Sequence, residues 1–82
     1  MSKVAVLFNV YPEDNMLDKA VENIKKAMNP PGLQVEDIAF GIKVIKVMFK
    51  FDDTRTSSSK IEDELRKVQG VGETEVIEEG LI

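Results

Sequence analysis

The amino-acid sequence predicts an α+β fold of the ferredoxin-like type, in which two helices cover one face of a four-stranded antiparallel sheet. Two observations predict it. Segments with strand and helix periodicity follow one another in the order β-α-β-β-α-β, the order of two split β-α-β halves. No linker or low-complexity tract interrupts them, and 82 residues with 43% hydrophobic content suffice for one core. We therefore expect residues 1–82 to form a single domain.

The first half of the sequence is typical of a strand, a turn and a helix. Residues 3–10 place apolar side chains on one parity, and residues 11–15 form a turn that ends in helix-capping residue types. Apolar residues then recur with helical spacing from Met16. The helix must end at residues 29–32 (Asn-Pro-Pro-Gly), because proline lacks an N–H donor and restricts the residue before it. The expected core-facing residues of the strand are Val4, Val6, Phe8 and Val10.

The second half predicts two strands, a helix and a last strand. Gly41 separates a weaker strand at residues 33–40 from a stronger one at residues 42–51. After the second helix, a shorter and more polar strand at residues 71–77 completes the pattern. The expected core-facing residues of the stronger strand are Ile45, Val47, Phe49 and Phe51.

The polar run before the second helix has two interpretations. Residues 57–60 (Ser-Ser-Ser-Lys) suggest a phosphate site at a helix N-terminus, but they lack the glycines of a phosphate loop. We favour a helix cap, because Ser59 and Glu62 have capping-box spacing. The first turn is then acidic at residues 62–64 and the last turn basic at residues 66–67, as the helix dipole favours.

The residue types present exclude most catalytic and metal chemistry. With neither cysteine nor histidine, the chain cannot build a disulfide, a thiolate or imidazole metal site, or a Ser-His-Asp triad. Carboxylates cluster at residues 73–79 and at residues 52–53, but their spacing matches no hard-cation loop, so we interpret them as solvated charge. We therefore expect no catalytic residue, no metal and no cofactor.

Charge and hydropathy argue against nucleic-acid and membrane partners. The net charge is −4, whereas nucleic-acid binding needs clustered lysine and arginine. No apolar run approaches the roughly 20 residues that span a bilayer, and the first residues lack a signal-peptide pattern. Base stacking on sheet aromatics is also disfavoured, because the strand phenylalanines fall on the buried parity. We expect a cytoplasmic protein.

The open face of the predicted sheet carries a small apolar group. Leu7, Val44 and Met48 share its parity and are framed by Lys46 and Lys50. They are either scattered surface residues of the kind that every protein exposes or a protein-contact patch. We favour the first interpretation.

The chain corner at Gly41 is the most informative feature of the sequence. Ile38, Ala39 and Phe40 lead directly into this glycine, where the chain changes direction and side chains tend to be exposed. Phe40 either fills the end of the core or projects as an interface anchor, and the pattern leaves both open. With catalysis, metals and nucleic acid eliminated, protein contact is the main use left for this corner.

Residues 38–43 (Ile-Ala-Phe-Gly-Ile-Lys) resemble the signature of translation elongation factor 1 beta, the exchange factor for elongation factor 1 alpha. The archaeal single-domain form of that family is similar in its other features. These are a first strand ending in a Tyr-Pro-Glu turn at residues 11–13, a strand at residues 43–51, and a Val-Gln-Gly-Val step at residues 68–71. The resemblance covers essentially the whole chain.

The resemblance implies that the chain promotes exchange of GDP for GTP by binding the GTPase and destabilising its nucleotide and magnesium site, with no bond chemistry of its own. It also implies that Phe40 inserts into the GTPase, and we expect Gly41, Ile42 and Lys43 to shape the contact. One feature departs from the family. Eukaryotic relatives carry a lysine next to the C-terminus that reaches toward the magnesium site, whereas residues 78–82 here hold no basic residue.

An alternative function is a small ligand-binding regulatory module of ferredoxin-like topology, of the amino-acid-sensing type. Such modules usually pair edge to edge, bind their ligand at the interface and are attached to an enzyme, and the sequence shows no attached enzyme. We therefore expect a monomeric exchange factor whose partner is elongation factor 1 alpha.

Overall fold

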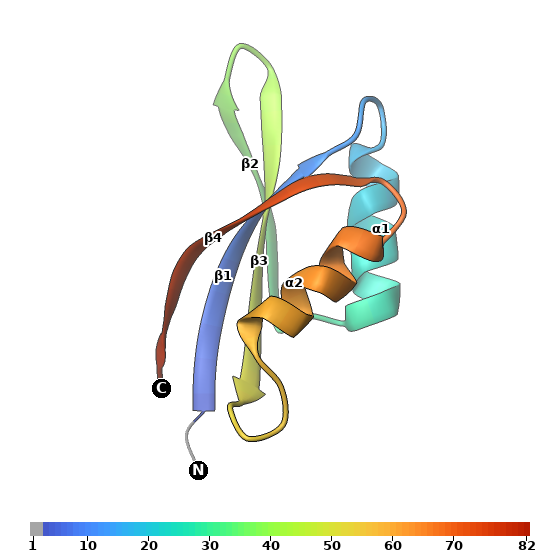
Figure 1. Ribbon diagram of the computed structural model, residues 1–82. Coiled ribbons are helices and arrows are strands. Elements are labelled where there is room, and N and C mark those ends of the chain that lie inside the picture. Colours follow the sequence, from blue (N-terminus) through green and yellow to red (C-terminus); the bar gives the residue numbers. More distant parts are fainter. Residues whose placement is uncertain (1–2) are drawn as a thin grey trace.

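The computed structural model describes residues 3–82 and confirms the predicted fold class. The four strands form one antiparallel sheet in the order β2-β3-β1-β4, and both helices lie on the same side of it (Figure 1). The elements are β1 (Lys3–Pro12), α1 (Leu17–Met28), β2 (Gly32–Ala39), β3 (Ile42–Asp52), α2 (Ser58–Lys67) and β4 (Val71–Leu81).

The core lies between the sheet and the helices, where strand parity places it. Phe8 of β1 and Phe49 of β3 meet edge to face, with ring centroids 6.0 Å apart, a favourable aromatic geometry. Of the eight residues expected to face the core from β1 and β3, seven are buried, and Phe51 is partly buried and packs against the core cluster. The helices contribute Ala20, Ile24, Ile61 and Leu65.

Val44 departs from the prediction. Its parity places it on the open face of the sheet, yet only 2% of its surface is exposed. Glu36 lies directly opposite it on β2 and extends across that face to an ion pair with Lys46, 3.1 Å between Nζ and Oε2. Val44 therefore does not join Leu7 and Met48 in an exposed patch.

The first helix begins without the predicted side-chain cap. The residue before it is Met16, which makes no side-chain cap hydrogen bond. Asn15 adopts a left-handed conformation with φ of 62°, so it turns the chain ahead of the helix instead of capping it.

The second helix is capped by a serine, as predicted, but by a different one. The Oγ of Ser57 accepts a hydrogen bond from the backbone N–H of Lys60, at 3.3 Å. The capping box of Ser59 with Glu62 is therefore wrong, and the first turn holds no acidic residue. The Glu62 carboxylate instead accepts a hydrogen bond from Thr74 Oγ1 at 3.0 Å, on β4. The basic last turn, Arg66 and Lys67, is confirmed.

The last strand is longer than predicted. It pairs with β1 as far as Leu81, which lies opposite Val4, and the Ile82 N–H donates to the Lys3 carbonyl at 2.9 Å. Most β4 side chains are exposed, so the sequence shows no pattern of buried residues from which the end of this strand could be predicted. The backbone ladder to β1 holds it in place.

Candidate protein-contact site at the hairpin tip

The β2–β3 hairpin ends in a two-residue turn that projects from one end of the molecule (Figure 1). Ala39 and Ile42 are direct partners across the strands, so Phe40 and Gly41 form the turn. Their φ angles are 52° and 79°, both positive, as two-residue hairpin turns of the I′ kind require. Glycine adopts this conformation without strain, whereas phenylalanine does so only at a cost.

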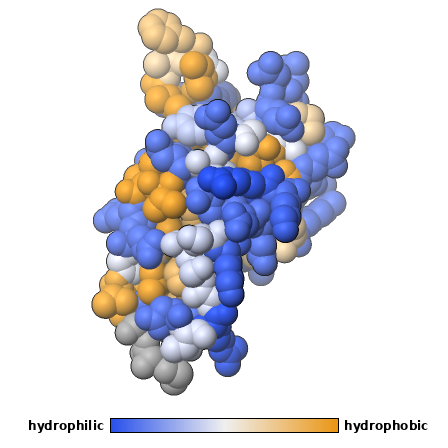
Figure 2. Space-filling model, viewed as in Figure 1, coloured by the Kyte–Doolittle hydropathy of each residue, from blue (hydrophilic) through white to orange (hydrophobic). Residues whose placement is uncertain are grey.

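The tip exposes a cluster of large apolar side chains. The surface of Phe40 is 101% exposed, and that of Ile38 and Ile42 is more than half exposed. Figure 2 shows hydrophobic colour gathered at this projecting end of the hairpin. Phe40 therefore does not fill the end of the core, and that interpretation is wrong. An aromatic residue held in water at a turn has the exposure that an interface anchor needs.

Ile38 belongs to this cluster and was missed as a site residue. The register between β2 and β3 shifts between Asp37 and Ala39, which leaves Ile38 without a direct partner. Such a bulge bends the strand and re-aims the side chain next to it. The sequence signal was present, because Ile38 is one of the apolar residues leading into Gly41.

The remaining predicted site residues lie at the same tip. A Cβ on Gly41 would meet no atom within 4 Å, so the glycine is required by its backbone angle alone. Lys43 is half exposed, and its Nζ lies 4.0 Å from Asp37 Oδ1, a loose surface pair worth little stability. The tip is thus an exposed apolar cluster, and the charged pair of Lys43 and Asp37 lies next to it.

Two carboxyls with displaced pKa values lie away from this site. The backbone N–H of Thr54 holds the pKa of Asp52 below its usual 3.8, and Asp52 is at the opposite end of β3 from the tip. The hydrogen bond from Lys26 lowers the pKa of Glu22, on α1. Within residues 3–82 no cluster of three acidic, cysteine or histidine side chains could hold a metal ion. No helix in the same range is long and apolar enough to cross a membrane.

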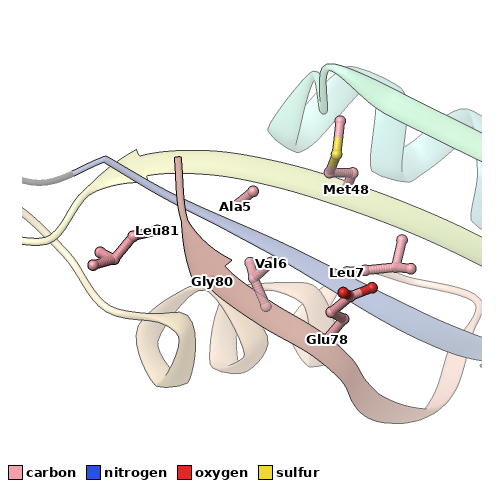
Figure 3. Close-up of a pocket in the computed structure, with 7 residues that line it drawn as sticks. All are labelled: Ala5, Val6, Leu7, Met48, Glu78, Gly80 and Leu81. Carbon is pink, nitrogen blue, oxygen red and sulfur yellow. The ribbon is translucent and has the colours of Figure 1, made fainter.

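A second concavity lies on the open face of the sheet. Leu7 and Met48 are cross-strand partners there, as are Ala5 and Gly80, and the small second pair leaves a hollow of about 280 Å³ (Figure 3). The hollow is apolar, and Glu78 is the one charged side chain among the described residues that line it. A free amino acid carries both an ammonium and a carboxylate group, and each needs a polar or charged partner when it is bound. This lining offers few such partners, which disfavours the amino-acid-sensing alternative.

The chain thus combines a ferredoxin-like sheet with a protruding, exposed aromatic residue at one hairpin tip. The family model of the EF-1 guanine nucleotide exchange domain matches residues 5–82, and the chain belongs to that family. It is therefore a guanine nucleotide exchange factor of translation elongation and not an enzyme with bond chemistry of its own. The resemblance drawn from residues 38–43 is confirmed.

Three archaeal proteins illustrate the similarity to curated relatives. The chain is 36% identical to elongation factor 1-beta of Aeropyrum pernix, over 93% of its own length and 92% of the relative's. It is also 36% identical to elongation factor 1-beta of Ignicoccus hospitalis, over 93% and 88% of the two chains. With the protein of the same name from Methanoculleus marisnigri it shares 26% identity over the full length of both.

Proposed function

We propose that the hairpin tip, residues 40–43, is the surface by which this chain docks on elongation factor 1 alpha to promote the exchange of GDP for GTP. The observation that carries the proposal is the complete exposure of Phe40 at a turn position that strains it. Strained backbone and exposed aromatics persist at functional sites, because the folded state alone does not favour them.

Burial of the tip in a partner supplies the binding free energy. Covering a fully exposed phenylalanine gains roughly 1.5–3 kcal/mol, and Ile38 and Ile42 add to this. The turn is already formed in the free protein and holds Phe40 in a defined place. Binding therefore spends little free energy on ordering the loop.

Exchange then follows from differential affinity. A factor that binds the nucleotide-free GTPase more tightly than the GDP-bound form weakens GDP binding by the same factor. Faster release also requires a lower barrier, which comes from displacing the elements that hold the nucleotide and its magnesium ion. The chain needs no acid, base or nucleophile for this role, in keeping with the residue types at the tip.

The working unit that we propose is a monomer made of residues 1–82 as a single exchange domain, acting in the cytoplasm, where translation takes place. One sheet and one core cluster support the single domain. Sedimentation analysis at micromolar concentration checks the state of assembly. A mass of twice 9.2 kDa would contradict the proposed monomer but would not bear on the proposed exchange activity.

The test is release of fluorescent GDP from elongation factor 1 alpha in excess GTP, with and without the chain. We expect the wild type to accelerate release and Phe40→Ala to lower the kcat/KM of exchange by about 30-fold, the loss typical of an interface hot spot. Val76→Ala is the matched control, because it truncates an exposed apolar residue on β4. No acceleration by the wild type would refute the proposed function, and full activity of Phe40→Ala would refute the tip as the docking surface.

A further inference from the structure

A groove runs beside the hairpin tip, between it and the loop that joins β1 to α1. Both segments project from the same end of the molecule (Figure 1). Residues 11–15 and Leu17 line one side of the groove, and residues 41–43 line the other, around a volume of about 310 Å³. The groove thus shares one side with the proposed docking surface, and its other side comes from a part of the chain that this surface does not include.

The lining combines an apolar floor with an acidic rim. Tyr11 and Leu17 are half-buried, and Ile42 lies across from them. Glu13 and Asp14 are exposed on the rim, and within residues 3–82 neither carboxylate forms an ion pair. The cation on the rim, Lys43, has Asp37 as its own neighbour at 4.0 Å. The groove is therefore net negative.

The loop that carries these carboxylates is fixed by backbone hydrogen bonds. The Glu13 N–H donates to the Gly70 carbonyl at 2.8 Å, and the Met16 N–H donates to the Glu13 carbonyl at 3.0 Å. Gly72 lies so close to this loop that a Cβ on it would come within 2.8 Å of the Tyr11 carbonyl oxygen. All these contacts are made by backbone atoms, so the two acidic side chains are free to bind a partner.

We propose that this groove receives a lysine or arginine side chain of the same GTPase that the tip contacts, and this inference rests on the proposed function. The aliphatic stem of such a side chain lies on Tyr11, Leu17 and Ile42, while its charged head meets Glu13 and Asp14. The charge complementarity selects a basic residue, and the position of the groove sets its distance from Phe40. The tip thereby supplies apolar anchoring, and the acidic loop fixes the orientation of the complex.

The experiment measures the affinity of the chain for nucleotide-free elongation factor 1 alpha and the rate of GDP release at two salt concentrations. The test variant is Glu13→Gln/Asp14→Asn. The control is Asp53→Asn/Glu64→Gln, which removes the same two charges from exposed positions on the β3–α2 loop and on α2. Both double variants change the net charge equally, so a general electrostatic effect would appear in both.

We expect the affinity of the test variant for the GTPase to fall about 5- to 20-fold, a loss typical of removing charge pairs from an interface. Its affinity should also depend less on salt concentration than that of the wild type. The control should stay within about twofold of the wild type, because its sites lie outside the interface. Equal behaviour of the two double variants would overturn the inference while leaving the exchange function intact. A wild-type chain that fails to accelerate GDP release would overturn both.

Discussion

Ala39 and Ile42 face each other directly across the β2–β3 hairpin, so only Phe40 and Gly41 connect the two strands. Both linking residues have positive φ angles, 52° and 79°. Turns of this length favour Asn-Gly, because asparagine tolerates the left-handed region far better than a bulky aromatic does. Phe40 therefore occupies a position whose backbone conformation suits asparagine better than phenylalanine.

Replacing Phe40 by asparagine should separate stability from function. We expect Phe40→Asn to raise the free energy of unfolding by about 1 kcal/mol, because it relieves the left-handed strain. The melting temperature of a domain of this size would rise by about 4–8 °C. Acceleration of GDP release should be lost at the same time. Thermal denaturation and the exchange assay check the two effects, and a more stable variant with full exchange activity would contradict the role of Phe40.

Replacement by alanine should affect stability differently at two glycines of β4. A Cβ on Gly72 would lie 2.8 Å from the Tyr11 carbonyl oxygen, so Gly72→Ala should cost about 1–3 kcal/mol of stability. Gly80 has no atom within 4 Å of its added Cβ, so Gly80→Ala should leave stability unchanged or raise it by up to about 1 kcal/mol. Urea denaturation of both variants tests this. An equal loss of stability in the two variants would show that the close contact with the Tyr11 carbonyl oxygen is not what requires glycine at position 72.

The stability of the chain should depend on the ionisation of Asp52 in acid. Its Oδ1 accepts hydrogen bonds from the Thr54 backbone N–H at 3.0 Å and the Thr54 hydroxyl at 2.8 Å, which lowers its pKa below 3.8. A carboxyl with a lowered pKa stabilises the fold above its unfolded pKa, and this contribution is lost as the pH falls through the folded value.

Asp52→Asn removes that titration. We expect its melting temperature to fall less steeply than that of the wild type as the pH drops below about 3.8, since one linked proton is no longer taken up on unfolding. The comparison is a series of melting curves between neutral pH and acid. Parallel curves for the two proteins would show that the Thr54 contacts do not stabilise the charged form.

The sequence predicted the fold because its periodicities are strong and local. Alternation in residues 3–10 and 42–51 identified the core faces, and two prolines after α1 marked its end. The same reasoning failed where neighbouring residues are chemically alike. Ser57 and Ser59 are both able to cap a helix, and only the chain path decides that Ser57 does so.

The candidate site was predictable in position but not in conformation. An apolar run entering Gly41 indicated an exposed corner, and the structure places Phe40 there. The neighbouring groove was not predictable, because Glu13 and Lys43 are far apart in the sequence and meet only through the pairing of β1 with β3. Strand parity also misplaced Val44, which lies opposite Glu36 of β2 and is buried.

The acidic edge of the sheet has a consequence for solubility. β4 is an edge strand, and its apolar residues Val76 and Ile77 are about 40% exposed, which makes them a potential template for pairing with another copy. Glu75 and Glu78 flank them directly. Two copies brought together along this edge would set carboxylate against carboxylate, so the glutamates act as gatekeepers against aggregation. We expect the chain to remain dispersed at high concentration at neutral pH.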